Sequence, residues 1–220
     1  MIKKELHKRI LTSLVLLPIL IFSIFSNSIL FNAILVAAFF LTTYEWYNIS
    51  KKSFIYFFIG FLIIIVFIIS AHFLRGTDKN SQQLFLWIIL IVIFSDTGGY
   101  FSGKIIGGKK LTKISPNKTI SGMIGSFGFA TFPIFIIYFL HNSELIIFEQ
   151  LTLSIKTIML SLLFSLVSQF GDLTISYFKR KNKIKDTGNI LPGHGGLLDR
   201  IDGLIFLLIF SAILKFVKII

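Results

Sequence analysis

The sequence predicts an all-α, polytopic integral membrane protein with about seven transmembrane helices and a polar cavity that faces the cytoplasm. First, 55% of the 220 residues are hydrophobic and the mean hydropathy is +0.85, which exceeds what a soluble domain of this size needs. Second, the apolar residues fall into runs long enough to cross a bilayer as helices. Third, acidic residues recur near one end of several runs. The lack of cysteine excludes disulfides and cysteine-ligated metals.

Seven apolar segments predict the membrane spans. They cover residues 10–25, 29–49, 54–73, 84–102, 120–140, 157–178 and 202–218. The first segment is short, carries Pro18, and follows basic residues without a small-residue cleavage site, which indicates an uncleaved span rather than a signal peptide. We divide the chain into an N-terminal region, residues 1–83, with about three spans, and a catalytic membrane region, residues 84–220, with four spans and two basic loops.

The distribution of basic residues predicts the orientation. A net charge of +12 would suggest nucleic-acid binding in a soluble protein, but in a membrane protein it is typical of cytoplasmic loops. With the N-terminus in the cytoplasm, most of the 22 Lys and Arg residues lie on the cytoplasmic side, including those of loops 103–119 and 179–201. We therefore expect a protein of the cell (inner) membrane whose N-terminus and active site face the cytoplasm, which contacts membrane lipid and binds no nucleic acid.

Five carboxylates fall at one depth in this orientation. Glu45, Asp96 and Asp172 lie near the cytoplasmic ends of their spans, and Asp199 and Asp202 begin the last span. A single intramembrane acid is often a buried hydrogen-bonding residue, but five at the same level indicate a polar cavity, because charge near lipid is costly unless it is used.

The span at residues 157–178 carries a polar stripe at helical spacing. Its members are Ser161, Ser165, Ser168, Asp172, Ser176 and Lys179. The small serines suit helix packing equally well. Asp172 does not, because a carboxylate in this setting needs a cation or hydrogen-bond donors.

The segment 192–203, PGHGGLLDRIDG, has the features of a phosphate-contacting loop. Its proline and glycines interrupt regular helix and expose backbone N–H groups, and a helix N-terminus follows, which attracts anions. Asp199 and Asp202 beside such a site suggest a divalent cation such as Mg²⁺. Helix capping would explain one of the two aspartates. His194 suits a metal, an acid–base role, or a hydrogen bond that orders the loop.

The stretch from Gly103 to Lys110 nearly matches a P-loop. We reject that interpretation because Lys110 stands where the motif needs Ser or Thr, and no strand precedes it. Glycines and lysines at the mouth of a span can still bind phosphate, and Lys118 precedes the next span in the same way. Lysines here are also typical of topology signals or contacts with lipid headgroups.

A longer pattern, S-x2-K-R-x4-K-D-x-G-x3-P-G-H-G-G-x2-D-R-x-D, runs from Ser176 to Asp202. It resembles the signature of the phosphatidate cytidylyltransferases (CDP-diacylglycerol synthases). The stretches DTGGYFSGK at 96–104 and ISPNKT at 114–119 resemble the middle region of that family. The resemblance covers about half of the chain. Ile175 and Ser121 depart from it, because the family often has Glu at these positions.

The resemblance implies an enzyme that joins CTP and phosphatidic acid into CDP-diacylglycerol and pyrophosphate. It also implies dependence on Mg²⁺, often with a second cation such as K⁺, and a homodimeric all-helical fold. The implied metal ligands are Asp172 and Asp199, with Asp202 close by. The candidate catalytic residues are Asp172, Lys179, Arg180, Lys185, Asp186, His194, Asp199, Arg200 and Asp202. The candidate substrate-binding residues are Asp96, Lys104, Ser115, Lys118, Ser176, Gly195 and Gly196.

Two alternatives use the same acidic residues. A cation-coupled membrane transporter would have broken or charged segments near the bilayer midplane and an internal repeat, and the sequence shows neither. The CDP-alcohol phosphotransferases begin their motif with D-x2-D-G, as Asp199 to Gly203 do, but the chain lacks the Ala-Arg and the later aspartates of that motif.

Overall fold

The computed structural model describes residues 2–112, 114–142, 151–191, 193 and 195–220; for residues 2–11, 13 and 140–142 it describes the backbone only. In these ranges the chain forms eight α-helices and no β-strand, apart from two isolated bridges. The helices are α1 (Ile2–Phe25), α2 (Ser28–Ser50), α3 (Phe54–Arg75), α4 (Lys79–Ile105), α5 (Ile120–Ala130), α6 (Phe132–Asn142), α7 (Ile155–Lys181) and α8 (Leu198–Phe216). The all-α prediction is confirmed.

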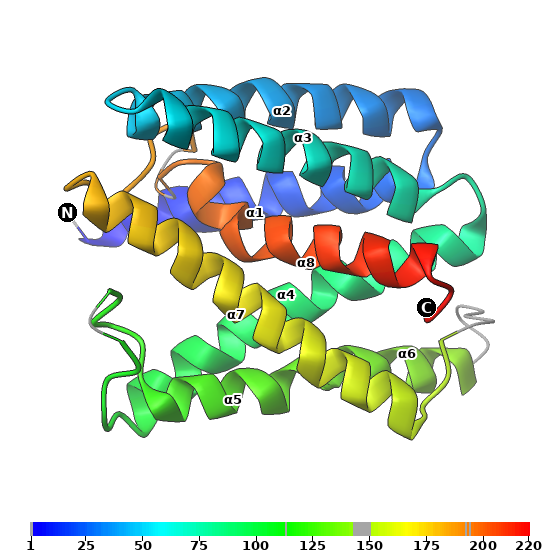
Figure 1. Ribbon diagram of the computed structural model, residues 1–220. Coiled ribbons are helices and arrows are strands. Elements are labelled where there is room, and N and C mark those ends of the chain that lie inside the picture. Colours follow the sequence, from blue (N-terminus) through cyan, green and yellow to red (C-terminus); the bar gives the residue numbers. More distant parts are fainter. Residues whose placement is uncertain (1, 113, 143–150, 192, 194) are drawn as a thin grey trace.

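The helices run back and forth, and the two termini lie at opposite ends of the bundle (Figure 1). Each predicted apolar segment is a helix, with one difference. The segment 120–140 is not continuous, because α5 ends at Ala130 and α6 begins at Phe132. Pro133 accounts for the break, since proline has no N–H for the helix ladder and its ring clashes with the carbonyl four residues before it.

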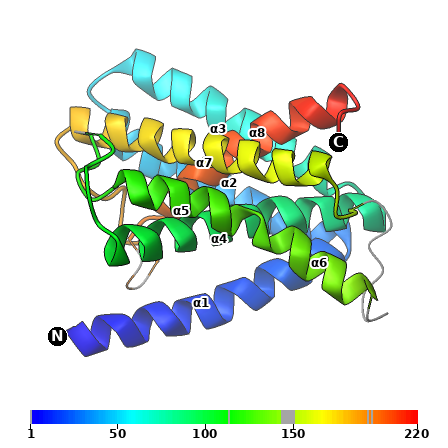
Figure 2. The same cartoon turned by 90° about the horizontal axis from the view of Figure 1, so that it is seen from below.

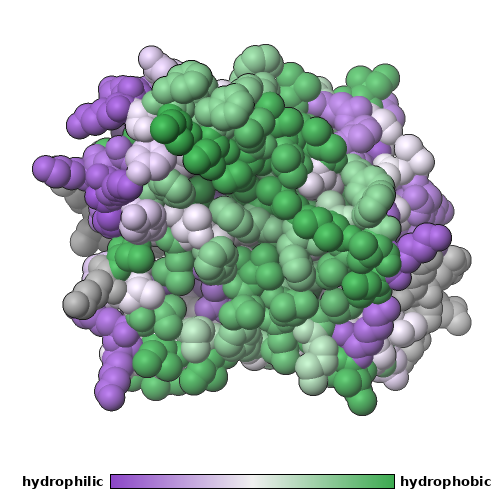
Figure 3. Space-filling view, in the orientation of Figure 1, coloured by the Kyte–Doolittle hydropathy of each residue, from purple (hydrophilic) through white to green (hydrophobic). Residues whose placement is uncertain are grey.

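Helix length and composition confirm a polytopic membrane protein. Five segments are long and apolar enough to cross a bilayer: Ser28–Ser50, Phe54–Arg75, Lys79–Ile105, Ile120–Phe139 and Ile155–Lys181. α1 adds a shorter apolar stretch, Leu14–Phe25. Figure 3 shows the corresponding surface, an apolar band between two polar ends. The number of spans, predicted as about seven, stays a prediction.

α8 packs between α3 and α7, and α1 lies along one edge of the bundle, beside α4 (Figures 1 and 2). Arg75, at the end of α3, holds the turn between α1 and α2. Its side chain is buried, its Nε donates to the carbonyl of Ile24 at 3.0 Å, and its Nη1 donates to the hydroxyl of Ser28 at 3.1 Å. Nη2 donates to the carbonyl of Ser26. The guanidinium therefore satisfies oxygens that the end of α1 leaves without helical partners.

Helices α4 and α5 approach closely along a line of glycines. A Cβ added at Gly125 would lie 2.0 Å from Oγ of Ser102, and one added at Gly98 would lie 2.4 Å from Cβ of Phe129. Gly99, Gly103 and Gly122 are similarly crowded. Small residues permit such close backbone approach between membrane helices. This pairing fixes the loop that joins α4 to α5.

Candidate active site

The polar stripe predicted on α7 lies on its buried face, except for Asp172, which is partly exposed. Ser161, Ser165 and Ser168 are almost fully buried, and Oγ of Ser165 lies 2.7 Å from Oγ of Ser95 on α4. A Cβ at Gly203 of α8 would lie 2.4 Å from Oγ of Ser168. These serines therefore serve helix packing. The charged members of the stripe, Asp172 and Lys179, form ion pairs instead.

An ion pair joins Asp172 on α7 to the loop before α5. Its Oδ2 contacts Nζ of Lys118, and its Oδ1 accepts a hydrogen bond from Oγ of Ser176 at 3.2 Å. The side chains of Asp172 and Lys118 are 27% and 28% exposed. Antiparallel backbone hydrogen bonds hold the loop, from the N–H of Leu111 to the carbonyl of Lys118 at 2.8 Å and from the N–H of Ile120 to the carbonyl of Lys109 at 3.0 Å.

A second ion pair joins the end of α7 to the start of α8. Nζ of Lys179 lies 2.7 Å from Oδ1 of Asp199, and the two side chains are only 9% and 8% exposed. Oδ2 of Asp199 accepts hydrogen bonds from the backbone N–H groups of Thr187 at 2.8 Å and Gly196 at 3.2 Å. Buried ion pairs are weak evidence for stability, because desolvation offsets their attraction. A pair of this kind therefore suggests a role beyond folding.

Three carboxylates from three helices interact electrostatically. The like charges of Asp96 on α4, Asp172 on α7 and Asp202 on α8 repel one another. Lys118 and Lys179 oppose this repulsion. Arg200, whose side chain is exposed, also interacts with Asp96. Oδ1 of Asp202 accepts from the backbone N–H of Gly203 at 2.8 Å. We call these five residues, Asp96, Lys118, Asp172, Lys179 and Asp202, the charge cluster.

The charge cluster suits a hard divalent cation, although the protein does not present a complete ligand set. Among the residues that the structure describes, no three His, Asp or Glu side chains are grouped closely enough to hold a metal ion by themselves. Mg²⁺ commonly takes one or two carboxylates and completes its shell with water and substrate phosphates. Asp172 and Asp202 lie close enough to interact as like charges. Both oxygens of Asp172 and both oxygens of Asp199 already have partners within the protein. The predicted metal roles of Asp172, Asp199 and Asp202 therefore stay predictions.

Three of the remaining predicted residues make local contacts. Nζ of Lys104 contacts Oη of Tyr100 at 3.4 Å, and Nη1 of Arg180 donates to the carbonyl of Ile184 at 2.9 Å. The carbonyl of Ser115 accepts from the N–H of Lys118 at 3.0 Å, so Ser115 shapes the turn before that lysine.

The loop between α7 and α8 carries the others. Lys185 and Asp186 are exposed on it. Gly195 has a φ of +88° and pairs with Leu191, while Gly196 is buried. His194 lies outside the described residues.

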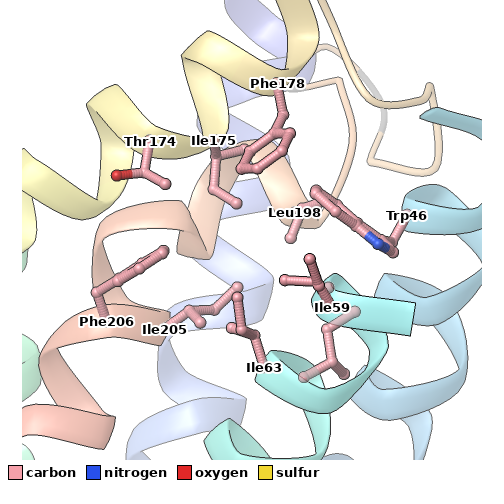
Figure 4. A pocket seen from close by; sticks show the side chains of 11 residues that line it. Trp46, Ile59, Ile63, Thr174, Ile175, Phe178, Leu198, Ile205 and Phe206 are labelled. Atoms are coloured by element: carbon pink, nitrogen blue, oxygen red, sulfur yellow. The ribbon is translucent and has the colours of Figure 1, made fainter. Parts of the chain in front are cut away.

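The structure also places the two residues that depart from the family pattern. Ile175 is buried and lines an apolar crevice between α2, α3, α7 and α8 (Figure 4). The labelled walls of the crevice are Trp46, Ile59, Ile63, Thr174, Ile175, Phe178, Leu198, Ile205 and Phe206. Oγ of Ser121 donates to the carbonyl of Gly107 and so closes the loop before α5. Both residues serve packing or loop closure in this chain.

The sequence singled out Glu45 as one of five acids of a polar cavity but did not reveal its contacts. The structure buries its carboxylate between α2 and the start of α8, where it accepts three hydrogen bonds. The signal in the sequence was the acid itself, near the end of an apolar span. Thr187, whose hydroxyl donates to Glu45, lies 142 residues further along the chain. Local spacing in the sequence does not reveal such a contact.

Comparison with known proteins adds an independent line of evidence. The sequence profile of the Cytidylyltransferase family matches residues 50–217. A phosphatidate cytidylyltransferase of Rickettsia bellii (strain RML369-C) is 37% identical over 206 residues, which span 92% of this chain and 87% of the relative. One of Rickettsia felis is 36% identical over 208 residues, with 92% and 89% covered. One of Staphylococcus aureus (strain COL) is 39% identical over 165 residues, with 73% and 60% covered.

Proposed function

The chain belongs to the cytidylyltransferase family, as a nucleotidyltransferase of the phosphatidate cytidylyltransferase group, and we propose that it transfers the cytidylyl group of CTP to phosphatidic acid. The products are CDP-diacylglycerol and pyrophosphate. The observation that carries the proposal is the charge cluster, which combines carboxylates and lysines from three helices and a loop at one polar end of an apolar bundle. A lipid phosphate and a water-soluble nucleotide could meet at such an end.

The chemistry needs positioning rather than a covalent enzyme intermediate. A phosphate oxygen of phosphatidic acid attacks the α-phosphorus of CTP, a new P–O bond forms, and the bond to the bridging oxygen of pyrophosphate breaks. Both substrates are polyanions, so most of the catalytic work is to hold them in line and to offset charge. Lys118 and Lys179 supply ammonium groups that phosphate oxygens would contact in place of the carboxylates they pair with here.

Magnesium is part of the proposal, with a second cation such as K⁺ beside it. Asp172 and Asp202 would hold Mg²⁺, with Asp199 available if Lys179 turns to a substrate phosphate. The ion would act as a Lewis acid and offset the negative charge on the phosphoryl oxygens of CTP. The protein's own part is to keep the carboxylates close together despite their repulsion, which Lys118 and Lys179 reduce.

The cellular setting is proposed on the same basis. The charge cluster lies at the end of the bundle to which the basic loops 103–119 and 179–201 belong, and the positive-inside rule assigns such loops to the cytoplasm. We therefore place the site and the N-terminus on the cytoplasmic face of the inner membrane. A homodimer is the expected assembly. The comparisons give the transporter alternative no support.

The experiment is turnover by the purified chain in detergent with phosphatidic acid, CTP and Mg²⁺, measured as released pyrophosphate and as CDP-diacylglycerol. Asp172→Asn should lower turnover about 100-fold or more, and a chelator should abolish turnover until Mg²⁺ is restored.

Asp78→Asn is the matched control, because Asp78 caps the start of α4, where it accepts from the N–H of Ser81 at 2.8 Å. The start of α4 lies at the opposite end of the bundle from the start of α8 (Figure 1), so this change should not affect turnover. A well-folded wild-type protein that forms no pyrophosphate would refute the proposal.

A further inference from the structure

We propose that Glu45 on α2 is a positioning residue for this reaction, which holds Thr187 and the start of α8 and, through Thr187, fixes the pair of Asp199 and Lys179. The proposal rests on the function proposed above. Glu45 lies outside the part of the chain that the family profile matches, and the contacts of its carboxylate carry the proposal.

The Glu45 carboxylate is buried, with 1% of the residue exposed, and accepts from three donors. Oε2 accepts from Oγ1 of Thr187 at 2.9 Å and from the backbone N–H of Leu198 at 2.7 Å. Oε1 accepts from the backbone N–H of Leu197 at 2.9 Å. The residue at the start of α8, Leu197, provides no side-chain cap of its own. Glu45 therefore caps α8 from a different helix, where a negative charge also suits the helix dipole.

Glu45 and Asp199 bind the same short segment from two sides. Thr187 donates its hydroxyl to Glu45 and its backbone N–H to Asp199. The N–H of Gly196 goes to Asp199, and the next two N–H groups go to Glu45. The other oxygen of Asp199 meets Lys179. A continuous path of hydrogen bonds thus runs from Glu45 through Thr187 and Asp199 to the ammonium of Lys179.

The arrangement is tightly packed at Gly196. A Cβ added at Gly196 would lie 1.9 Å from Oγ1 of Thr187 and 2.7 Å from Oε2 of Glu45. The part of α2 that carries Glu45 is held in place as well. Next to Glu45, Nε1 of Trp46 donates to the carbonyls of Tyr56 at 3.1 Å and Phe57 at 3.2 Å. The Trp46 ring also packs edge-on against Phe178 of α7, with centroids 5.4 Å apart (Figure 4).

These contacts make Glu45→Gln a sharp test. Each oxygen of Glu45 accepts from a backbone N–H, so the amide nitrogen of Gln would face a donor whichever way it turned. Thr187 and the start of α8 should then loosen, and Lys179 should lose its fixed place. Displacement of a positioning group by about 1 Å can cost about 100-fold in rate. We expect kcat to fall by about that factor, while KM for phosphatidic acid stays near its wild-type value.

Thr187→Val is the second variant, because it removes only the hydroxyl that links Glu45 to the Asp199 side. Thr187→Val should also lower kcat. The double variant with Glu45→Gln should have a kcat close to that of Glu45→Gln alone. The control is Asp78→Ala, which removes a carboxylate cap from α4 far from the site. This control should lower the melting temperature without changing kcat per folded molecule.

Amide hydrogen exchange provides a readout that needs no turnover. Exchange should rise in the peptides that cover residues 187–198 of Glu45→Gln and stay at wild-type levels elsewhere. A Glu45→Gln protein with wild-type kcat, or one whose exchange rises equally over the whole chain, would overturn the inference. A wild-type protein without turnover would instead overturn the proposed function, and exchange would still decide whether Glu45 holds the segment.

Discussion

Replacing Asp199 by Asn leaves the buried ammonium of Lys179 without its counter-charge. At the observed 2.7 Å, the attraction between the two unit charges is about 6 kcal/mol for an effective dielectric constant of about 20. Desolvation of the two ions offsets much of this in the wild type, but removing one partner leaves the other buried and unpaired, which typically costs about 3–5 kcal/mol. For a chain of this length that loss corresponds to a fall in melting temperature of about 6–20 °C.

The assay is thermal unfolding in detergent, followed by tryptophan fluorescence, to which Trp46 contributes from its place against Phe178 of α7. Lys179→Met should cost less than Asp199→Asn, because Asp199 keeps its bonds to the N–H groups of Thr187 and Gly196. The double variant should be more stable than the sum of the two single losses predicts. An Asp199→Asn protein that melts within about 2 °C of the wild type would refute this reasoning, because it would show that Lys179 does not depend on Asp199 as its counter-charge.

Two further predictions concern packing. Gly196→Ala should lower turnover, and should lower the free energy of unfolding by about 1–3 kcal/mol, because the new Cβ would collide with Thr187 and Glu45. The matched control is Gly128→Ala, whose Cβ meets nothing within 4 Å. Equal activities for the two variants would contradict the crowding at Gly196. Arg75→Met should lower the melting temperature, because the carbonyls of Ile24 and Ser26 lose a charged donor. The value of kcat per folded molecule should stay at that of the wild type. A lower kcat at full stability would show that the turn between α1 and α2 influences the site.

Much of the fold follows from hydrophobic patterning, because apolar runs of membrane length leave few alternatives to helices. The break at Thr131 was not predicted, although Pro133 was its signal. The polar stripe on α7 followed from helical spacing, and so did the distinction between Asp172 and the serines. The contacts of Glu45 could not be predicted in this way. Its partners, Thr187, Leu197 and Leu198, are contributed by tertiary packing, and a single sequence carries no record of which distant groups meet.

The glycine line between α4 and α5 has a consequence for mutational tolerance. Positions 98, 99, 103, 122 and 125 carry no reactive group, yet added side-chain atoms at each would meet an opposing atom within 3 Å. A saturation scan for growth or turnover should therefore return these glycines among the least replaceable positions in the chain. A ranking by tolerance alone would count them with the aspartates and lysines of the site. Measuring the amount of folded protein beside the activity separates the two groups, because the glycine variants should lose both together.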